Sequence, residues 1–240
     1  MEHKLESFYF KADSKQKQGP QARCHSDLSA FLDTYASVPE AERCFFEQIR
    51  EGQTCNEYYD IDWILDEAPD SSSDTIATLE QRVFIAFLVA RNQYAPNYAV
   101  ASEQCRVLSA SSSKKVSLHI IIPTYVFEDN HKHMKAFMLE FQNVRRTQDQ
   151  QILNGRLLEH IDMGVYSKSR LMRILRNHKC RDPSRPLQRP QWHEPSMVAE
   201  DCEFFICNVV PDCVKVASNV QGATVKRVKS QGSWFQTLNS

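Results

Sequence analysis

Hydrophobic and polar positions along the chain follow two periods, and each period predicts a different kind of element. Apolar residues recur every three or four positions in the longer segments, so we expect helices at 26–35, 75–95 and 131–146. Apolar residues alternate with polar ones, or run together, in the shorter segments, so we expect strands at 56–63, 98–108, 116–122, 169–177 and 202–210. Strands and helices do not alternate regularly, which predicts an α+β fold.

Proline-bearing and polar stretches mark the expected limits of these elements. Pro123 is expected to close the strand at 116–122, and the four prolines of 181–195 predict a long loop. We expect a polar N-terminal segment at 1–24, a folded region at 25–231 and a flexible tail at 232–240.

Composition places the chain among ordinary globular proteins. It has 240 residues, of which 42% are hydrophobic and 25% charged, and this excludes a collagen-like or wholly disordered chain. No apolar run is long enough to cross a membrane, and residues 1–10 lack the apolar stretch of a secretory signal. We therefore expect an intracellular protein with no membrane partner. The sequence does not distinguish a nuclear, mitochondrial or viral-replication site.

The cysteines and the charges add two expectations. None of the eight cysteines forms a C-x2-C pair, so we expect free, mostly buried thiols and no zinc within this chain. The net charge is −1, yet residues 163–190 hold eight Lys or Arg against Asp182 alone. Such a basic block is either a phosphate-binding face or a solvated charged loop, and charge alone leaves both interpretations open.

Asp60 and Asp62 form the first candidate site. Side chains alternate along a strand, so these two carboxylates share one face, while Tyr59, Ile61 and Trp63 take the buried face. Paired carboxylates are hard oxygen ligands suited to Mg²⁺ or Mn²⁺. The alternative is an exposed strand face with two solvated carboxylates.

Two further motifs carry hydrogen-bond donors. Lys115, Ser117 and His119 share one face of the strand at 116–122 and make a donor row suited to a phosphate chain; the alternative is a core histidine bonded to backbone. In the stretch 162–173 a carboxylate precedes a turn and then cations. Arg170 and Arg173 would lie on opposite faces of a regular strand, so a bend or bulge is needed for both to reach one ligand. The alternative for these arginines is a surface strand with paired carboxylates.

The three motifs in their order resemble the archaeo-eukaryotic primase superfamily, and within it the PrimPol (primase–polymerase) branch. They are D-x-D at 60–62, K-x-S-x-H at 115–119 and D-x-G-V-Y-S-K-x-R-x-x-R at 162–173, and the resemblance covers about residues 40–180. It implies that 25–231 is a two-module catalytic domain, with an RRM-like antiparallel sheet and a catalytic cleft between the modules.

The resemblance also implies roles for single residues. Catalysis and metal binding, with two Mg²⁺ or Mn²⁺ ions, would fall to Asp60, Asp62 and Asp162. Nucleotide binding would fall to Lys115, Ser117, His119, Arg170 and Arg173, with Lys179 extending that cluster. The implied activity is DNA-dependent nucleotidyl transfer from dNTPs or NTPs, which extends primers, and in some members synthesises them, on single-stranded DNA templates.

One departure and three alternatives remain. PrimPol proteins often carry a C-terminal zinc-binding module, and no convincing Cys/His set follows Cys213, so we expect such a module or a helicase to lie outside this chain. A catalytically silent module that binds single-stranded nucleic acid is one alternative, and a template-independent nucleotidyltransferase is another. A Rep-type nickase would need a His-hydrophobic-His pair and a nucleophilic tyrosine such as Tyr166, whereas His131-Lys132-His133 has lysine in the middle.

Overall fold

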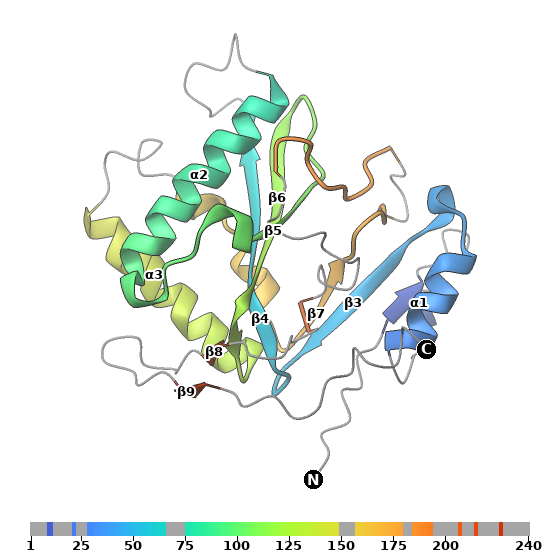
Figure 1. Cartoon of the computed structure of the whole chain (residues 1–240), viewed down its shortest axis with the longest axis horizontal. Helices are drawn as coiled ribbons and strands as arrows, with labels where there is room; N and C mark the ends of the chain where they lie inside the picture. Colours follow the sequence, from blue (N-terminus) through green and yellow to red (C-terminus); the bar gives the residue numbers. More distant parts are fainter. Residues whose placement is uncertain are drawn as a thin grey trace.

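The computed structural model describes residues 9–11, 21–22, 28–65, 75–148, 157–179, 184–193, 206–207, 214–215 and 226–227. Within these residues the chain is α+β, as predicted, with two mainly antiparallel sheets and few helices. Figure 1 shows one sheet in the middle of the molecule, helices α2 and α3 on one side of it, and the second sheet with α1 on the other.

The central sheet is built on two long antiparallel strands, β4 (Cys55–Ile64) and β6 (Lys115–Phe127). β5 (Arg106–Ser109) pairs with β6 antiparallel, β8 (Val214–Lys215) pairs with it in parallel, and β9 (Lys226–Arg227) follows β8. β4 confirms the strand predicted at 56–63.

The sequence predicted that the strand at 116–122 ends before Pro123, but β6 continues to Phe127. The pairing of Glu57 with Ile122 is followed by that of Asn56 with Val126, so residues 123–125 are a bulge in β6. A bulge leaves the extra residues without ladder partners on β4, which suits a proline because it has no N–H to donate. The strand can therefore continue past Pro123.

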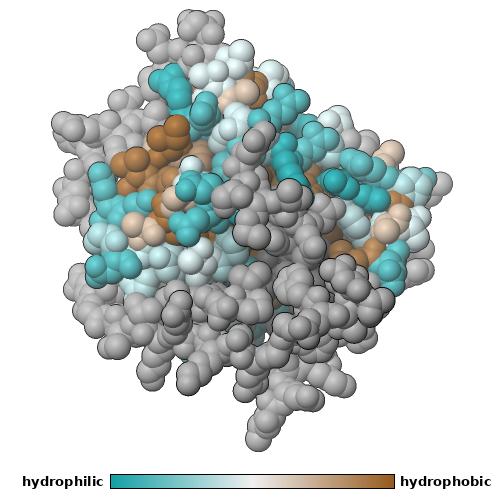
Figure 2. Space-filling view, in the orientation of Figure 1, coloured by the Kyte–Doolittle hydropathy of each residue, from teal (hydrophilic) through white to brown (hydrophobic). Residues whose placement is uncertain are grey.

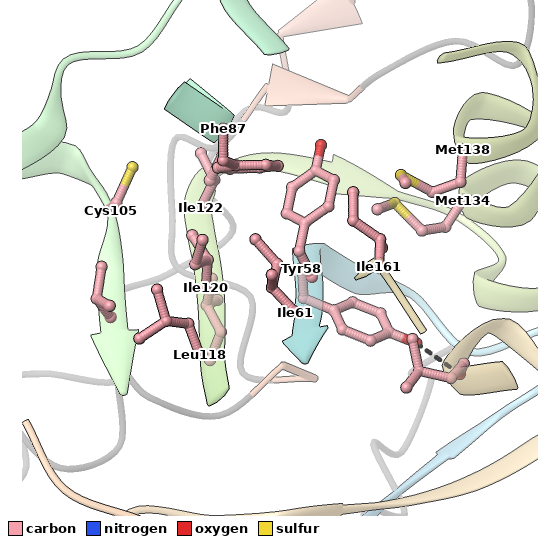
Figure 3. Packing of buried hydrophobic residues seen from close by; sticks show 14 of the residues in the cluster. Tyr58, Ile61, Phe87, Cys105, Leu118, Ile120, Ile122, Met134, Met138 and Ile161 are labelled. Carbon is pink, nitrogen blue, oxygen red and sulfur yellow. Dashed lines mark hydrogen bonds between the residues drawn. The ribbon is translucent and has the colours of Figure 1, made fainter. Parts of the chain in front are cut away.

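Three helical elements lie beside the central sheet. Two of them, α2 (Ile76–Tyr94) and α3 (Lys135–Gln148), lie on one face of it, and the third, the π-helical turn η5 (Asn130–Met134), leads into α3 and also contacts β3; all three are close to the predicted helices. Thr75 caps α2, because its hydroxyl accepts a hydrogen bond from Thr78 N. The main core lies between these helices and the sheet (Figure 3), and Tyr59 packs its ring 4.5 Å from that of Phe87.

The outer surface of the same helices carries apolar side chains. Ile85 and Val89 of α2 are 51% and 43% exposed, and Leu139 of α3 is 47% exposed. Figure 2 shows hydrophobic surface over α2 in this view, surrounded by hydrophilic groups. No helix in the described ranges has the length and apolar character needed to cross a membrane.

The second sheet has the order β2-β1-β3-β7 and is antiparallel throughout. Its strands are β1 (Tyr9–Lys11), β2 (Gln21–Ala22), β3 (Phe45–Arg50) and β7 (Ser169–Arg173). Helix α1 (Leu28–Ser37) packs on it through a small cluster around Phe31, Tyr35 and Phe45. A short 3-10 helix, η1 (Glu40–Glu42), joins α1 to β3. Thus β1 and β2 belong to the stretch predicted as a polar N-terminal segment, and β3 was not predicted.

Two predicted strands need correction, and a third lies mostly outside the described residues. Of 98–108, only the end forms β5, because Pro96–Tyr98 (η3) and Ser102–Gln104 (η4) are 3-10 turns. β7 ends at Arg173 rather than at 177, and Arg176 takes a left-handed backbone conformation with φ of 58°. Most of 202–210 lies outside the described residues, and the two described there, Ile206 and Cys207, form a bend.

The cysteines follow the expectation in part. Cys55, Cys105 and Cys207 are free and buried. Cys44 is disulfide-bonded, which contradicts the expectation of free thiols, and its partner lies outside the described residues.

Two further short helices connect α3 to the second sheet. They are η7 (Leu157–His160) and η8 (Met163–Tyr166), and Ile161 between them forms an isolated bridge with Ile61 of β4. This bridge brings the third sequence motif against the first.

Candidate active site

The first two sequence motifs face each other across a pair of adjacent strands. In the β4–β6 ladder Asp60 lies directly opposite His119, and Asp62 lies directly opposite Ser117. Directly opposed residues in an antiparallel pair have their side chains on the same face. Tyr59, which packs on α2, points to the helical side, so the two carboxylates point toward the second sheet.

Asp62 is held by two donors from β6. Its Oδ1 lies 2.8 Å from Lys115 Nζ and accepts a hydrogen bond of 2.6 Å from Ser117 Oγ. Partial burial raises the pKa of this carboxyl, but the bonds from Lys115 and Ser117 outweigh it, and the net pKa is lowered. Asp62 is therefore a carboxylate at neutral pH.

Asp60 and His119 form a loose pair, with 3.6 Å between Oδ1 and Nε2. Burial raises the pKa of Asp60, and repulsion from Asp62 and Asp162 raises it further, against the attraction of His119. Burial also lowers the pKa of His119, which makes the imidazole neutral at neutral pH. For both groups desolvation outweighs their mutual attraction, so the pair is not a full ion pair.

Asp162 is joined to Asp60 through the backbone. Its N–H donates to Asp60 O at 2.8 Å, and its Oδ1 accepts from Gly164 N at 2.8 Å. A Cβ on residue 164 would lie 2.9 Å from that same Oδ1, so glycine makes room for this turn. The D-x-G part of the motif thus fixes the third carboxylate beside β4.

The cations of the third motif come from the second sheet and the turn after it. Arg170 Nη2 contacts Asp162 Oδ2 at 3.1 Å. Arg173 and Lys179 both lie near enough to His119 to lower its pKa by repulsion, and Arg173 also donates to Arg185 O at 2.9 Å. Arg173 is the last residue of β7 and pairs with Phe46, and the β3–β7 register contains no bulge between Ser169 and Arg173.

The structure thus brings all of the sequence-predicted residues to one region between the two sheets. Within the described part of the chain, no three His, Cys, Asp or Glu side chains already stand as a group that could hold a metal ion. The carboxylates instead face Lys115, His119 and Arg170. Burial is the main cause of the raised pKa of Asp60, and repulsion from Asp62 and Asp162 adds to it. A divalent cation would relieve that repulsion, and carboxylate oxygens are ligands that suit Mg²⁺ or Mn²⁺.

Sequence reasoning missed a buried polar network behind the carboxylates. Tyr58 has the same strand parity as Asp60 and Asp62, and its hydroxyl reaches Asn130 and Val165. The alternation that grouped the two carboxylates could also have found Tyr58. Asn130 carried no such signal, because its place depends on how η5 packs against β4.

Comparison with known proteins does not assign a family to the chain, so any functional assignment depends on the site. No model of a known protein family matches the chain, and no curated protein matches it.

Proposed function

We propose that the chain is the catalytic core of a DNA-dependent primase–polymerase, a metal-dependent nucleotidyltransferase. The observation that carries the proposal is the register of β4 on β6, which sets Asp60 and Asp62 opposite His119 and Ser117. Asp162 joins the same face through its backbone bond to Asp60. A carboxylate cluster beside a row of donors is the arrangement that nucleotidyl transfer needs.

The fold is compatible with this proposal. The helix-covered central sheet and the β3–β7 sheet would be the two modules of an archaeo-eukaryotic primase, with the carboxylates between them. The basic residues that follow Asp162 would face the phosphates of nucleotide and template.

In the proposed mechanism Asp60, Asp62 and Asp162 would hold two Mg²⁺ or Mn²⁺ ions. Bound metal would supply activation of the primer 3′-hydroxyl and neutralise charge on the α-phosphoryl group. Lys115 and Arg170 neutralise Asp62 and Asp162 in the structure. With metal bound at the carboxylates, Lys115 and Arg170 would be able to contact the triphosphate, which carries about four negative charges.

His119 has a distinct part in this mechanism. Its lowered pKa keeps the ring neutral, so it offers one N–H donor to a phosphate or sugar oxygen rather than a charge. Arg173 and Lys179, which act on His119 electrostatically, extend the positive potential on the same side. The substrates are then dNTPs or NTPs with a single-stranded DNA template and a primer, and a zinc module or helicase would be a partner outside this chain.

The nickase alternative is disfavoured by the burial of its tyrosine. Tyr166 is fully buried, donates its hydroxyl to Tyr58 O at 2.8 Å, and has a pKa raised well above the ordinary value by burial. A nucleophile that attacks DNA has to reach its substrate. The silent-module alternative would not need the three carboxylates, whereas Asp60, Asp62 and Asp162 are all present and act on one another electrostatically at Asp60.

The proposal is tested by following labelled dNTP or NTP incorporation with Mg²⁺ or Mn²⁺. Three substrates are compared: a primed template, the same single-stranded DNA without primer, and primer alone. We expect addition of the complementary nucleotide on the primed template, abolished by EDTA. Addition to primer alone would indicate a template-independent transferase, cleavage would indicate a nickase, and DNA binding without incorporation would indicate a silent module.

A further inference from the structure

Three consecutive carbonyls of the segment 165–167 are each held by a side chain from another element. Val165 O lies 2.9 Å from the Tyr58 hydroxyl, and Tyr166 O lies 3.0 Å from His131 Nδ1. Ser167 O accepts from Asn130 Nδ2 at 3.3 Å. A short segment whose successive carbonyls are all bonded in this way has little freedom to move.

Tyr58 is the centre of this network. Its hydroxyl is also 2.6 Å from Asn130 Oδ1, and since it carries one proton it donates to one of these two oxygens at a time. Its own carbonyl accepts the hydroxyl of Tyr166, whose ring centroid lies 5.2 Å away. Figure 3 shows Tyr58 beside Ile61 and Ile161 in the core, with a dashed line marking a hydrogen bond between core residues.

Parts of this network are close in sequence to the residues of the candidate site. Tyr58 precedes Asp60 and Asp62 on the same face of β4, while the held segment connects Asp162 to Arg170. Asn130 and His131 come from the π-helical turn η5, a conformation frequent at functional sites. Asp129 fixes that turn by accepting from His131 N at 2.8 Å and Lys132 N at 2.9 Å.

We infer that Tyr58, Asn130 and His131 are positioning residues, which hold segment 165–167 so that Asp162 and Arg170 stand at a fixed place beside Asp60. The inference rests on the proposed function for its catalytic meaning, but the holding of the segment is a property of the fold. It also gives a role to His131 of the His131-Lys132-His133 motif. That role is to hold Tyr166 O, and it does not involve a metal. Metal affinity depends on such supporting contacts as well as on the ligands themselves.

The test removes one oxygen atom from the network. Tyr58→Phe keeps the ring and deletes the hydroxyl. Tyr35→Phe is the matched control, because Tyr35 is also buried and donates its hydroxyl to a backbone carbonyl, Leu175 O at 2.8 Å, away from the site. Hydrogen–deuterium exchange of the backbone amides of 162–168 is measured in both variants. We expect exchange about tenfold faster in Tyr58→Phe and unchanged in Tyr35→Phe.

A second measurement follows the metal directly. Mn²⁺ binding to the protein without DNA is titrated by electron paramagnetic resonance, and we expect the Kd to rise about tenfold in Tyr58→Phe only. In nucleotide incorporation the same variant should lose kcat with little change in DNA affinity. Exchange at 162–168 that stays at the wild-type rate would overturn the inference.

If Tyr58→Phe does not fold, two substitutions of the partly exposed His131 test the inference instead. His131→Leu removes the donor to Tyr166 O, while His131→Gln keeps a donor. We expect fast exchange at 162–168 in the first and rescue in the second; equal exchange in the two would overturn the inference. If the wild-type protein binds no Mn²⁺ and incorporates no nucleotide, the proposed function fails, and the exchange comparison still decides whether these residues hold the segment.

Discussion

At the scale of single residues, burial rather than pairing decides which groups of the site carry charge. Asp60 and His119 are paired, yet desolvation moves the two pKa values toward each other instead of apart. Asp62 is less buried and keeps its charge through Lys115 and Ser117. The site therefore combines one firmly ionised carboxylate with a carboxyl that protonates more easily, beside a neutral donor.

The neutral state of His119 leads to a kinetic prediction. His119→Ala should raise the KM for nucleotide about tenfold, because it removes a hydrogen bond to a charged phosphate. Arg170→Lys should also raise it, since lysine cannot form the two parallel bonds of a guanidinium. Steady-state kinetics with varied nucleotide measure both effects.

DNA-binding titrations provide the control for these variants, with Arg82→Lys on the exposed side of α2 as a matched substitution. We expect all three variants to bind DNA like the wild type. Loss of DNA affinity with unchanged KM would instead assign His119 and Arg170 to the template groove.

At the scale of elements, a buried ion pair joins β4 to α2. Arg91 Nη2 and Nε contact the two carboxylate oxygens of Glu57 at 2.7 Å and 2.8 Å, and both side chains have no exposed surface. Tyr59 donates to Glu57, and Arg91 also donates to Tyr98 O. Every charged atom of the pair thus has a partner inside the protein, which is the condition for a buried pair to be tolerated.

Breaking this pair should be costly. Arg91→Met leaves an unpaired buried carboxylate and should lower the free energy of unfolding by about 3–5 kcal/mol. The double variant Glu57→Gln/Arg91→Met removes both charges and should lose less than the single one. Urea denaturation of both variants measures this, and a cost below about 1 kcal/mol for Arg91→Met would contradict the role given to the pair.

Elements with a clear period were predictable from the sequence, and the others depend on tertiary contacts. β4, β6 and α2 follow alternation or capping. β3 was missed because Glu47, a charged residue, occupies one of its core-facing positions. The stretch around Val100 was wrongly predicted as a strand, since the Asn92 side chain, rather than a neighbouring strand, bonds both Val100 N and Val100 O.

The same distinction applies to the candidate site. Alternation was enough to group Asp60 with Asp62 and Ser117 with His119 on their own strands. Their direct opposition depends on the register between β4 and β6, which no local pattern specifies. Arg173 lies near enough to His119 to lower its pKa although the two residues belong to different sheets, and no local pattern specifies how two sheets pack.

At the scale of the whole molecule, Glu47 links the two sheets. It lies in β3 of the second sheet, is 1% exposed, and accepts from Ile206 N at 2.8 Å and Cys207 N at 2.6 Å. Ile206 O in turn accepts from Asn56 N of β4 at 2.7 Å. Burial raises the pKa of Glu47 to about 7, against the lowering effect of the two backbone bonds.

This raised pKa makes stability depend on pH. Between about pH 4.5 and 7 the folded state binds a proton that the unfolded state has released, so this contribution to stability falls as pH rises. At roughly 1.4 kcal/mol per pKa unit, the contribution lost across that window is about 3 kcal/mol. Glu47→Gln cannot titrate, so its stability relative to the wild type should improve by about 2–3 kcal/mol between about pH 5 and pH 8.

Urea denaturation at those two pH values tests the prediction, with the exposed Glu42→Gln as the matched control. The difference in the free energy of unfolding between Glu42→Gln and the wild type should be the same at both pH values. A constant difference for Glu47→Gln would show that Glu47 does not titrate in this range.

The central claim is that Asp60 and Asp62 are metal ligands of template-directed nucleotidyl transfer. The most direct measurement is single-nucleotide extension of a primed template, with Mg²⁺ or Mn²⁺, by the wild type and by Asp60→Asn/Asp62→Asn. We predict that the wild type adds the complementary nucleotide. The variant should be slower by about a thousandfold or more at unchanged DNA affinity, because metal stabilisation is worth several kcal/mol. A variant that keeps more than about a tenth of the wild-type rate would contradict the claim.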